Sequence, residues 1–131
     1  MTRALVTGAA GFLGSHVAEA LLARGLAVTG IDNFDPFYDR AAKEANLSAA
    51  RRHPAFRFVE GDILDAEALA GLLDADTLVV HLAAKAGVRP SLADPAGYAR
   101  ANVEGTAAIL AAVRAAGVRR VVFASSSSVY G

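Results

Sequence analysis

The stretch ALVTGAAGFLG, residues 4–14, decides the fold of this chain. Its first four residues are a short apolar run that ends at Gly8, and apolar side chains then recur at helical spacing from Phe12 to Leu22. This order predicts a strand, a glycine turn and a helix. Arg24-Gly25 marks the end of the predicted helix.

Four further apolar runs of strand length follow, at residues 26–31, 56–59, 77–82 and 121–123. Between them the sequence predicts a loop at 34–38, a helix at 39–52, a short helix from an Asp65 cap to Leu73, and a long helix from Asp94-Pro95 towards Ala116. Strands that alternate with helices, without in-and-out alternation of their own, predict an α/β fold with a parallel sheet. We expect a Rossmann-like doubly wound sheet of five strands in the order 3-2-1-4-5.

The composition is that of one globular domain filling residues 1–131. Hydrophobic residues make up 54% of the chain and charged residues 20%, which excludes a disordered chain. Thirteen basic side chains balance thirteen acidic ones, so no global charge attracts nucleic acid or a membrane surface. The chain has no cysteine and no apolar run of membrane-spanning length. We therefore expect a cytoplasmic protein without a metal site.

Three glycines, Gly8, Gly11 and Gly14, lie between the first predicted strand and the first predicted helix. Backbone amides at a helix N-terminus, together with the helix dipole, form a site for a pyrophosphate. Gly8 permits the tight turn, Gly11 lets phosphate oxygens approach the backbone, and Gly14 lets the helix pack closely on the sheet. An ordinary turn could also use these glycines, but their position at the first strand-helix junction favours a dinucleotide site. We place Phe12 and Leu13 in the same cofactor-binding turn.

Asp32 closes the second predicted strand, 18 residues after Gly14. A carboxylate there can accept hydrogen bonds from the adenosine ribose and would repel a 2′-phosphate, which favours NAD over NADP. Asn33 follows it, and the nearest basic side chain in the sequence, Arg40, lies beyond a loop that contains a proline. Without the glycines, a turn-forming role at the end of a strand would be a fair alternative for Asp32.

Two further positions at strand ends carry polar side chains. Asp62 and Ile63 follow the third strand and could flank the adenine ring, the Asp accepting from its amino group and the Ile packing on its face. By themselves, these two residues would indicate only a turn. His81 ends a buried strand, and we interpret it as a core residue with satisfied hydrogen bonds rather than as an acid or base.

Four motifs resemble the extended short-chain dehydrogenase/reductase family, the NAD-dependent epimerases and dehydratases of nucleotide sugars. They are TGAAGFLG (7–14), HLAA (81–84), NVEGT (102–106) and SSSSVYG (125–131), and the resemblance covers the whole chain. IDNF (31–34), FYD (37–39) and AKAGVRPS (84–91) are most similar to the UDP-glucuronate 4-epimerases within that family.

The resemblance implies a set of contacts to NAD and to a UDP-sugar. Residues 82–84, which are Leu82, Ala83 and Ala84, would line the ribose on the nicotinamide side, and Ser125 would also contact the cofactor. Asn102 would steady the fourth and fifth strands. Residues 85–91 would border the sugar nucleotide.

Two cations in that last segment keep open roles. Arg89 could pair with a substrate carboxylate or phosphate, or could be a solvated charge in a glycine-containing loop. Lys85 stands where family members commonly have glutamine, so the resemblance does not define its role.

In the family's mechanism, NAD takes a hydride from C4 of the sugar and returns it to the other face. A tyrosine removes the hydroxyl proton while a serine or threonine hydrogen-bonds the reacting oxygen. The resemblance implies that Ser126 is this catalytic serine, and that Ser127 and Ser128 face the substrate. Because neither neighbour is acidic, dehydration and decarboxylation are disfavoured. A plain polar loop is the alternative for the four serines.

The family's Tyr-x-x-x-Lys pair does not occur in this sequence. The chain therefore resembles only the N-terminal, NAD-binding part of such an enzyme, truncated relative to the family, and we expect it to bind NAD without efficient turnover. A non-catalytic NAD-binding module is the alternative function. In a fold truncated at this point, the fifth strand would be an apolar edge, which predicts self-association, for example as a homodimer.

Overall fold

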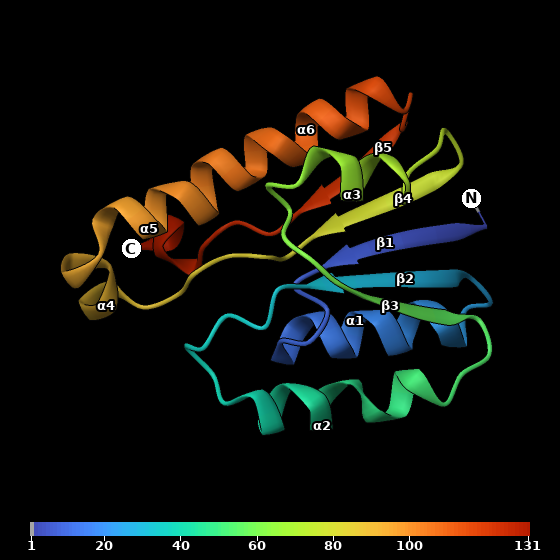
Figure 1. Ribbon diagram of the computed structural model, residues 1–131, viewed down its shortest axis with the longest axis horizontal. Helices are drawn as coiled ribbons and strands as arrows, with labels where there is room; N and C mark the ends of the chain where they lie inside the picture. The colour runs from blue at the N-terminus through green and yellow to red at the C-terminus, as the bar shows by residue number, and fades with distance from the viewer. Residues whose placement is uncertain (1) are drawn as a thin grey trace.

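Residues 2–131 are described by a computed structural model in which strands alternate with helices along the chain (Figure 1). The strands are β1 (Arg3–Thr7), β2 (Ala27–Asp32), β3 (Phe56–Glu60), β4 (Thr77–His81) and β5 (Arg120–Phe123). The helices are α1 (Phe12–Ala23), α2 (Arg40–Arg51), α3 (Ala66–Ala70), α4 (Val88–Ala93), α5 (Pro95–Ala99), a π-helical segment (Arg100–Glu104), α6 (Gly105–Ala115) and a 3₁₀ helix (Ser127–Tyr130).

The strands form one parallel sheet in the order β3-β2-β1-β4-β5, which confirms the predicted fold class and strand order. β1 is central, and Thr7 at its end lies in register with Ile31 on one side and His81 on the other. The strand order reverses between β1 and β4. In open α/β sheets, the crevice beyond the carboxyl ends of the strands at such a point is the usual ligand site.

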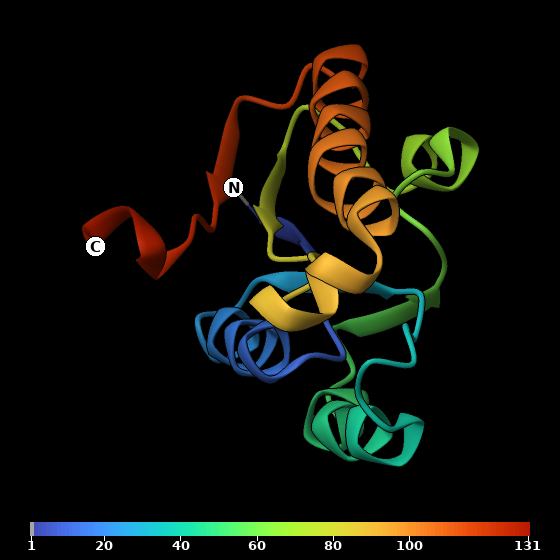
Figure 2. The same ribbon diagram turned by 90° about the vertical axis from the view of Figure 1, so that its left-hand side faces the viewer.

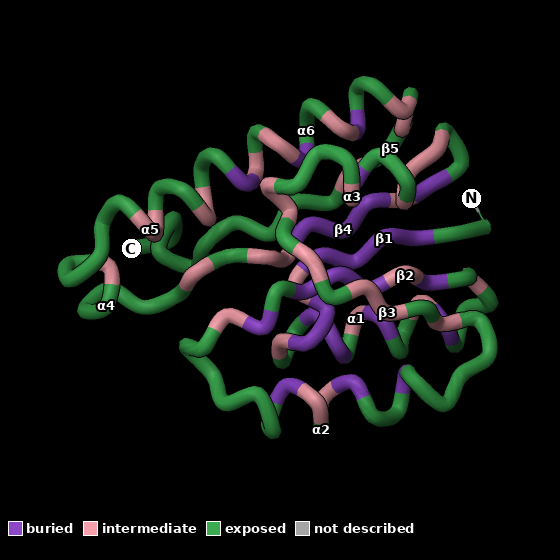
Figure 3. The backbone as a smooth tube through the Cα atoms, in the orientation of Figure 1, coloured by how far each residue is buried: buried purple, intermediate pink, exposed green. Residues whose placement is uncertain are grey.

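Helices cover both faces of the sheet. α1 and α2 lie on one face, and α3 and α6 lie on the other (Figures 1 and 2). One core cluster lies between the sheet and the α1 and α2 layer, and it includes Val6 and Val28 of the strands and Leu22 of α1. A second cluster lies on the other face and includes Leu5 of β1 and Ile109 of α6. Burial is therefore concentrated on the central strands (Figure 3), which explains why they show no in-and-out alternation. None of the helices within residues 2–131 is long and apolar enough to span a membrane.

The long helix predicted from Asp94-Pro95 to Ala116 is confirmed, with a π-helical turn inside it. It consists of α5, the π-helical segment and α6 in direct succession. The hydroxyl of Thr106 donates to the carbonyl of Asn102 at 2.6 Å, a local side-chain bond of the kind that perturbs regular helical bonding. Single π-helical turns inside α-helices are frequent at functional sites.

The structure corrects one of the two alternatives for Arg89, the one that placed it in a loop. This residue lies in α4 rather than in a loop. Gly87, with a φ of 98°, turns the chain into the helix, and Pro90 occupies the first helical turn, where the missing N–H removes no intrahelical bond. The glycine and proline therefore start a helix here, whereas in sequence they indicate a loop.

Candidate functional site

The glycine turn joins β1 to α1 at the carboxyl edge of the sheet. Gly8 has a φ of 67°, in the left-handed region that favours glycine, and its carbonyl accepts from the Gly11 N–H at 3.0 Å. A Cβ at Gly8 would also lie 2.9 Å from the backbone nitrogen of Ala83. The turn therefore packs directly against the chain that leaves β4.

The N-terminus of α1 has no side-chain cap, since its N-cap residue is Gly11. By contrast, Asp39, Asp65 and Asp94 cap α2, α3 and α5 with their carboxylates. The first N–H groups of a helix have no intrahelical acceptor, and the positive end of the helix dipole lies beside them. The start of α1 can therefore accept an anionic group such as a pyrophosphate.

Asp32 lies at the end of β2 and is 7% exposed. Its Oδ2 accepts from the Ala10 N–H at 3.0 Å, and its Oδ1 accepts from the Phe34 N–H at 2.8 Å. The ammonium of Lys43 on α2 lies 3.2 Å from Oδ1. The carboxylate is thus held in place by the glycine turn, by its own loop and by a helix.

Lys43 is a site residue that the sequence reasoning missed. It is 7% exposed, although lysine is one of the residues least often buried. The signal was its spacing from Leu47 and Ala50, four and seven positions on, which puts all three on the buried face of α2.

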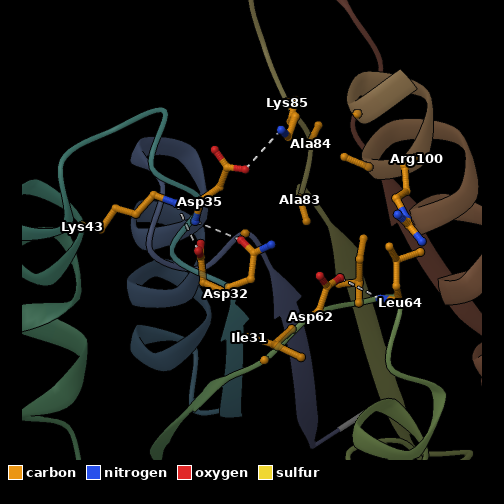
Figure 4. Close-up of a pocket in the computed structure, with 16 residues that line it drawn as sticks. Ile31, Asp32, Asp35, Lys43, Asp62, Leu64, Ala83, Ala84, Lys85 and Arg100 are labelled. Atoms are coloured by element: carbon orange, nitrogen blue, oxygen red, sulfur yellow. Dashed lines mark hydrogen bonds and ion pairs between the residues drawn. The ribbon is translucent and has the colours of Figure 1, made fainter. Parts of the chain in front are cut away.

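A cavity of about 300 Å³ lies at the carboxyl ends of the strands (Figure 4). This volume is at the lower end of the range for ligand pockets. Several predicted cofactor residues line it together, although they come from separate strand ends: Gly8, Asp32, Asn33, Asp62, Ile63, Ala83 and Ala84. The sequence did not predict Lys43, Leu64 or Arg100 as part of the lining.

Other predicted residues lie outside this lining. Phe12 and Leu13 start α1 with side chains 72% and 62% exposed, next to Gly11 and Gly14. Leu82 donates its N–H to the Thr7 hydroxyl at 3.0 Å and lies just before the lining residues.

The predicted catalytic and substrate residues, and the predicted cofactor residue Ser125, are at the surface. Ser125, Ser126, Ser127 and Ser128 follow β5 and are exposed, as is Arg89 in α4. Ser126 caps the 3₁₀ helix, and its hydroxyl accepts from the Ser128 N–H at 3.1 Å. Figure 2 shows this segment projecting from the end of β5, and none of its residues lines the cavity.

Asn102 in the π-helical segment binds the backbone of Lys85 through both the oxygen and the nitrogen of its side-chain amide. Its Oδ1 accepts from the Lys85 N–H at 2.8 Å, and its Nδ2 donates to the Lys85 carbonyl at 3.0 Å. Asn102 therefore fixes the segment that follows β4. A hydrogen bond to β5, which its expected role includes, is not found within residues 2–131.

Lys85 extends across the mouth of the cavity between two loops. Its ammonium lies 3.5 Å from Asp35 Oδ2 and 3.9 Å from Asp94 Oδ2. Since this side chain is 30% exposed, the two ion pairs are screened by solvent and contribute little stability. Their geometry nevertheless connects the loop after β2 to the start of α5.

His81 is a core residue, as its sequence position indicates. It is 3% exposed, and burial lowers the pKa of its imidazole, so the ring is neutral. Thr106 donates to Asn102, so its oxygen accepts from His81 Nε2–H at 3.0 Å. Thr7 accepts from two backbone N–H groups, so its own proton points to His81 Nδ1 at 2.7 Å. This network fixes the ends of β1 and β4 without assigning acid-base chemistry to His81.

The parallel sheet, the glycine turn at its first strand-helix junction and the carboxylate at the end of β2 together define a dinucleotide-binding α/β protein. The comparisons with known proteins agree. Residues 4–131 match the NAD dependent epimerase/dehydratase family, and the chain belongs to that family.

The chain is 49% identical to UDP-glucuronate 4-epimerase 1 of Arabidopsis thaliana over 97% of its length, which is 30% of the plant protein. It is 41% identical to the UDP-glucuronate 4-epimerase of Thermodesulfobacterium geofontis, covering 96% of this chain and 40% of that protein. Among solved structures, a UDP-glucuronic acid 4-epimerase variant from Bacillus cereus, bound to NAD and UDP-4-deoxy-4-fluoro-glucuronic acid, matches with a TM-score of 0.90 at 39% identity. That match covers 98% of this chain and 41% of the Bacillus chain. The chain thus spans less than half the length of these relatives.

Proposed function

We propose that residues 1–131 form the NAD-binding domain of a nucleotide-sugar 4-epimerase of the UDP-glucuronate type. The observation that carries this proposal is the Asp32 carboxylate, held beside the glycine turn in a cavity at the switch point between β1 and β4. A carboxylate at this place accepts hydrogen bonds from the ribose of a dinucleotide without a 2′-phosphate. The sequence identity to UDP-glucuronate 4-epimerases supports the epimerase assignment.

The cavity residues, together with the start of α1 beyond Gly8, suit the parts of NAD in the order in which they occur along the carboxyl edge. The start of α1 would hold the pyrophosphate, while Asp32 and Asn33 would bind the adenosine ribose. Asp62 accepts from the Leu64 N–H at 2.9 Å through one oxygen, which leaves the other for the adenine amino group. Ile63 is packed against the start of α6, where a Cβ on Gly105 would lie 2.7 Å from its Cδ1, so its position beside the ring would be fixed.

The chemistry of the whole enzyme would take place next to the segment after β5. There Ser126 would hydrogen-bond the reacting oxygen of a UDP-sugar, with Ser127, Ser128 and Arg89 on the substrate side. Bound NAD would accept a hydride from C4 of the sugar and return it. Ser125 and residues 82–84 would border the nicotinamide half.

Calorimetric titration tests the cofactor assignment. We expect one saturable NAD site per chain, and an at least tenfold weaker one in Gly11→Ala, since a methyl group would enter the phosphate turn, a change of about 1.4 kcal/mol. A Cβ at Gly11 meets only the Gly8 carbonyl oxygen, at 3.2 Å, so the variant should fold. Gly71→Ala is the matched control, because its Cβ would lie 3.9 Å from the Ala68 carbonyl oxygen, at the end of α3.

Two results of these titrations would contradict two different parts of the proposal. Absence of NAD binding to the folded wild-type chain would refute the function proposed for this domain. Equal weakening by Gly11→Ala and Gly71→Ala would show that the glycine turn does not bind the pyrophosphate.

The proposal includes self-association through the exposed strand β5. This strand pairs only with β4 among the described strands, and its Val122 and Phe123 are 48% and 59% exposed. An unpaired apolar strand edge favours pairing with a second copy. Sedimentation velocity of the 131-residue chain should show a concentration-dependent dimer that Phe123→Lys weakens. A monomer at every concentration would contradict it.

A further inference from the structure

The buried ion pair between Asp32 and Lys43 lies in the wall of the cavity. The side chain of Asp32 is 5% exposed and that of Lys43 is 9% exposed, with 3.2 Å between Oδ1 and Nζ. Both residues line the cavity, and Figure 4 shows the Lys43 side chain reaching Asp32 from α2. The negative charge attributed to Asp32 alone is therefore shared with a cation at the same place.

We propose that Lys43 is a specificity-determining residue for the adenosine ribose, so that the Asp32–Lys43 pair sets the preference for NAD over NADP. This inference rests on the NAD-binding function proposed above. In the pair, the Asp32 carboxylate neutralises the positive charge of the Lys43 ammonium. If the carboxylate is neutralised, the ammonium becomes a binding group for a 2′-phosphate.

The hydrogen-bond inventory supports this role. A carboxylate offers about four acceptor positions, and three are taken by Ala10, Phe34 and Lys43. An ammonium has three donors. One reaches Asp32, and the other two have no protein hydrogen-bond acceptor within residues 2–131. A buried ammonium with unused donors in a cavity wall is suited to an oxygen of the ligand, either a ribose hydroxyl or a phosphate.

The neighbouring cations do not share this position. Arg40 lies on the same helix, but its guanidinium is 2.6 Å from Glu60 and stacks over Phe34 at 4.1 Å. Arg100 enters the cavity beside Leu64, away from Asp32 (Figure 4). Lys85, the remaining cation of the lining, pairs with Asp35 and Asp94. Lys43 is therefore the one cation paired with Asp32 among the described cavity residues.

Titrations with NAD and NADP on four chains test the proposal: wild type, Asp32→Asn, Lys43→Met and Asp32→Asn/Lys43→Met. Asparagine keeps the shape of the carboxylate and an acceptor oxygen, and methionine keeps most of the apolar stem of lysine. We expect Asp32→Asn to raise the NADP-to-NAD affinity ratio at least tenfold, and the double variant to lose most of that rise. Lys43→Met alone should lower the ratio below that of wild type, because the carboxylate is then uncompensated.

The control is Asp32→Asn/Arg40→Met, which removes a cation of the same helix and should keep the raised ratio. Salt should reduce NADP binding by Asp32→Asn more than by Asp32→Asn/Lys43→Met, as expected for a phosphate-ammonium contact. Circular dichroism and thermal melts establish that each variant is folded. The proposal is overturned if Asp32→Asn does not raise the NADP-to-NAD affinity ratio, if the ratio rises only because NAD binding is lost, or if the rise is the same whether or not Lys43→Met is also present. NAD binding by the wild-type chain tests the proposed function separately.

Discussion

Gly14→Ala is expected to lower the free energy of unfolding by about 3 kcal/mol or more, at the upper end of what overpacking costs. Gly14 is buried in the first turns of α1, and a Cβ there would overlap the carbonyl oxygen of Gly8. The Gly8 carbonyl oxygen belongs to the backbone at a tight turn, and the position of a Cβ is fixed by the backbone of its own residue, so neither atom can move by changing a rotamer. The helix would have to shift away from β1, which would break the contacts of α1 with the core.

Urea unfolding followed by circular dichroism measures this loss. A domain of this size has a total stability of about 5–15 kcal/mol, so Gly14→Ala should lose a large share of it. Gly71→Ala makes the same chemical change where the backbone has ordinary helical angles and the Cβ meets only van der Waals contact, and it should change stability little. If the two variants unfold at the same urea concentration, the close packing at Gly14 is not a constraint on the fold.

Most of the fold could be predicted because each strand and helix has a local signal. The apolar runs became β1 to β5 with shifts of one residue or so at their ends, and Asp65 caps α3 as expected. The strand order followed from right-handed crossovers between parallel strands, which leave few alternatives. For these strands and for the start of α3, the local sequence signals agree with the topology of the folded sheet.

The π-helical turn inside the long helix could not be predicted, because the contact that accompanies it is tertiary. Asn102 uses its side-chain amide to hold the backbone of Lys85, and that partner is 17 positions earlier in the chain. In sequence, residues 95–116 are a continuous helical pattern, so propensity alone predicts one helix. The π-helical segment instead places Asn102 where it can reach the loop after β4.

The candidate site also contains some residues that the sequence predicts and one that it does not. The glycines and Asp32 are positions at strand ends whose roles follow from the chain direction, and the structure brings Gly8, Asp32, Asp62 and Ala83 to one cavity. Lys43 was missed because a charged residue among the other polar residues of α2 usually indicates a solvated face. Only the position of α2 against the end of β2 turns that charge inward.

Asp32→Ala is expected to lower the free energy of unfolding by about 3–5 kcal/mol even without cofactor, the usual cost of removing one partner of a buried ion pair. The change would leave the Lys43 ammonium, 9% exposed, without its carboxylate. It would also remove the acceptor of the Ala10 and Phe34 N–H groups. Loss of NAD binding by this variant would therefore report on folding as well as on the ribose contact.

A double-mutant cycle with Lys43→Met separates these contributions. Because the second substitution removes the uncompensated charge, Asp32→Ala/Lys43→Met should be more stable than the sum of the single losses by at least about 1 kcal/mol, within the range for residues in direct contact. Asp35→Ala serves as the control, since its carboxylate is 28% exposed and should cost much less. Strict additivity in urea unfolding would mean that the Asp32–Lys43 pair is not coupled in the folded chain. A positive coupling would show that Asp32, the residue proposed to bind the ribose, and Lys43, which holds α2 against the end of β2, are energetically coupled in one buried ion pair. That coupling would explain why a charge on α2 is turned towards the cavity.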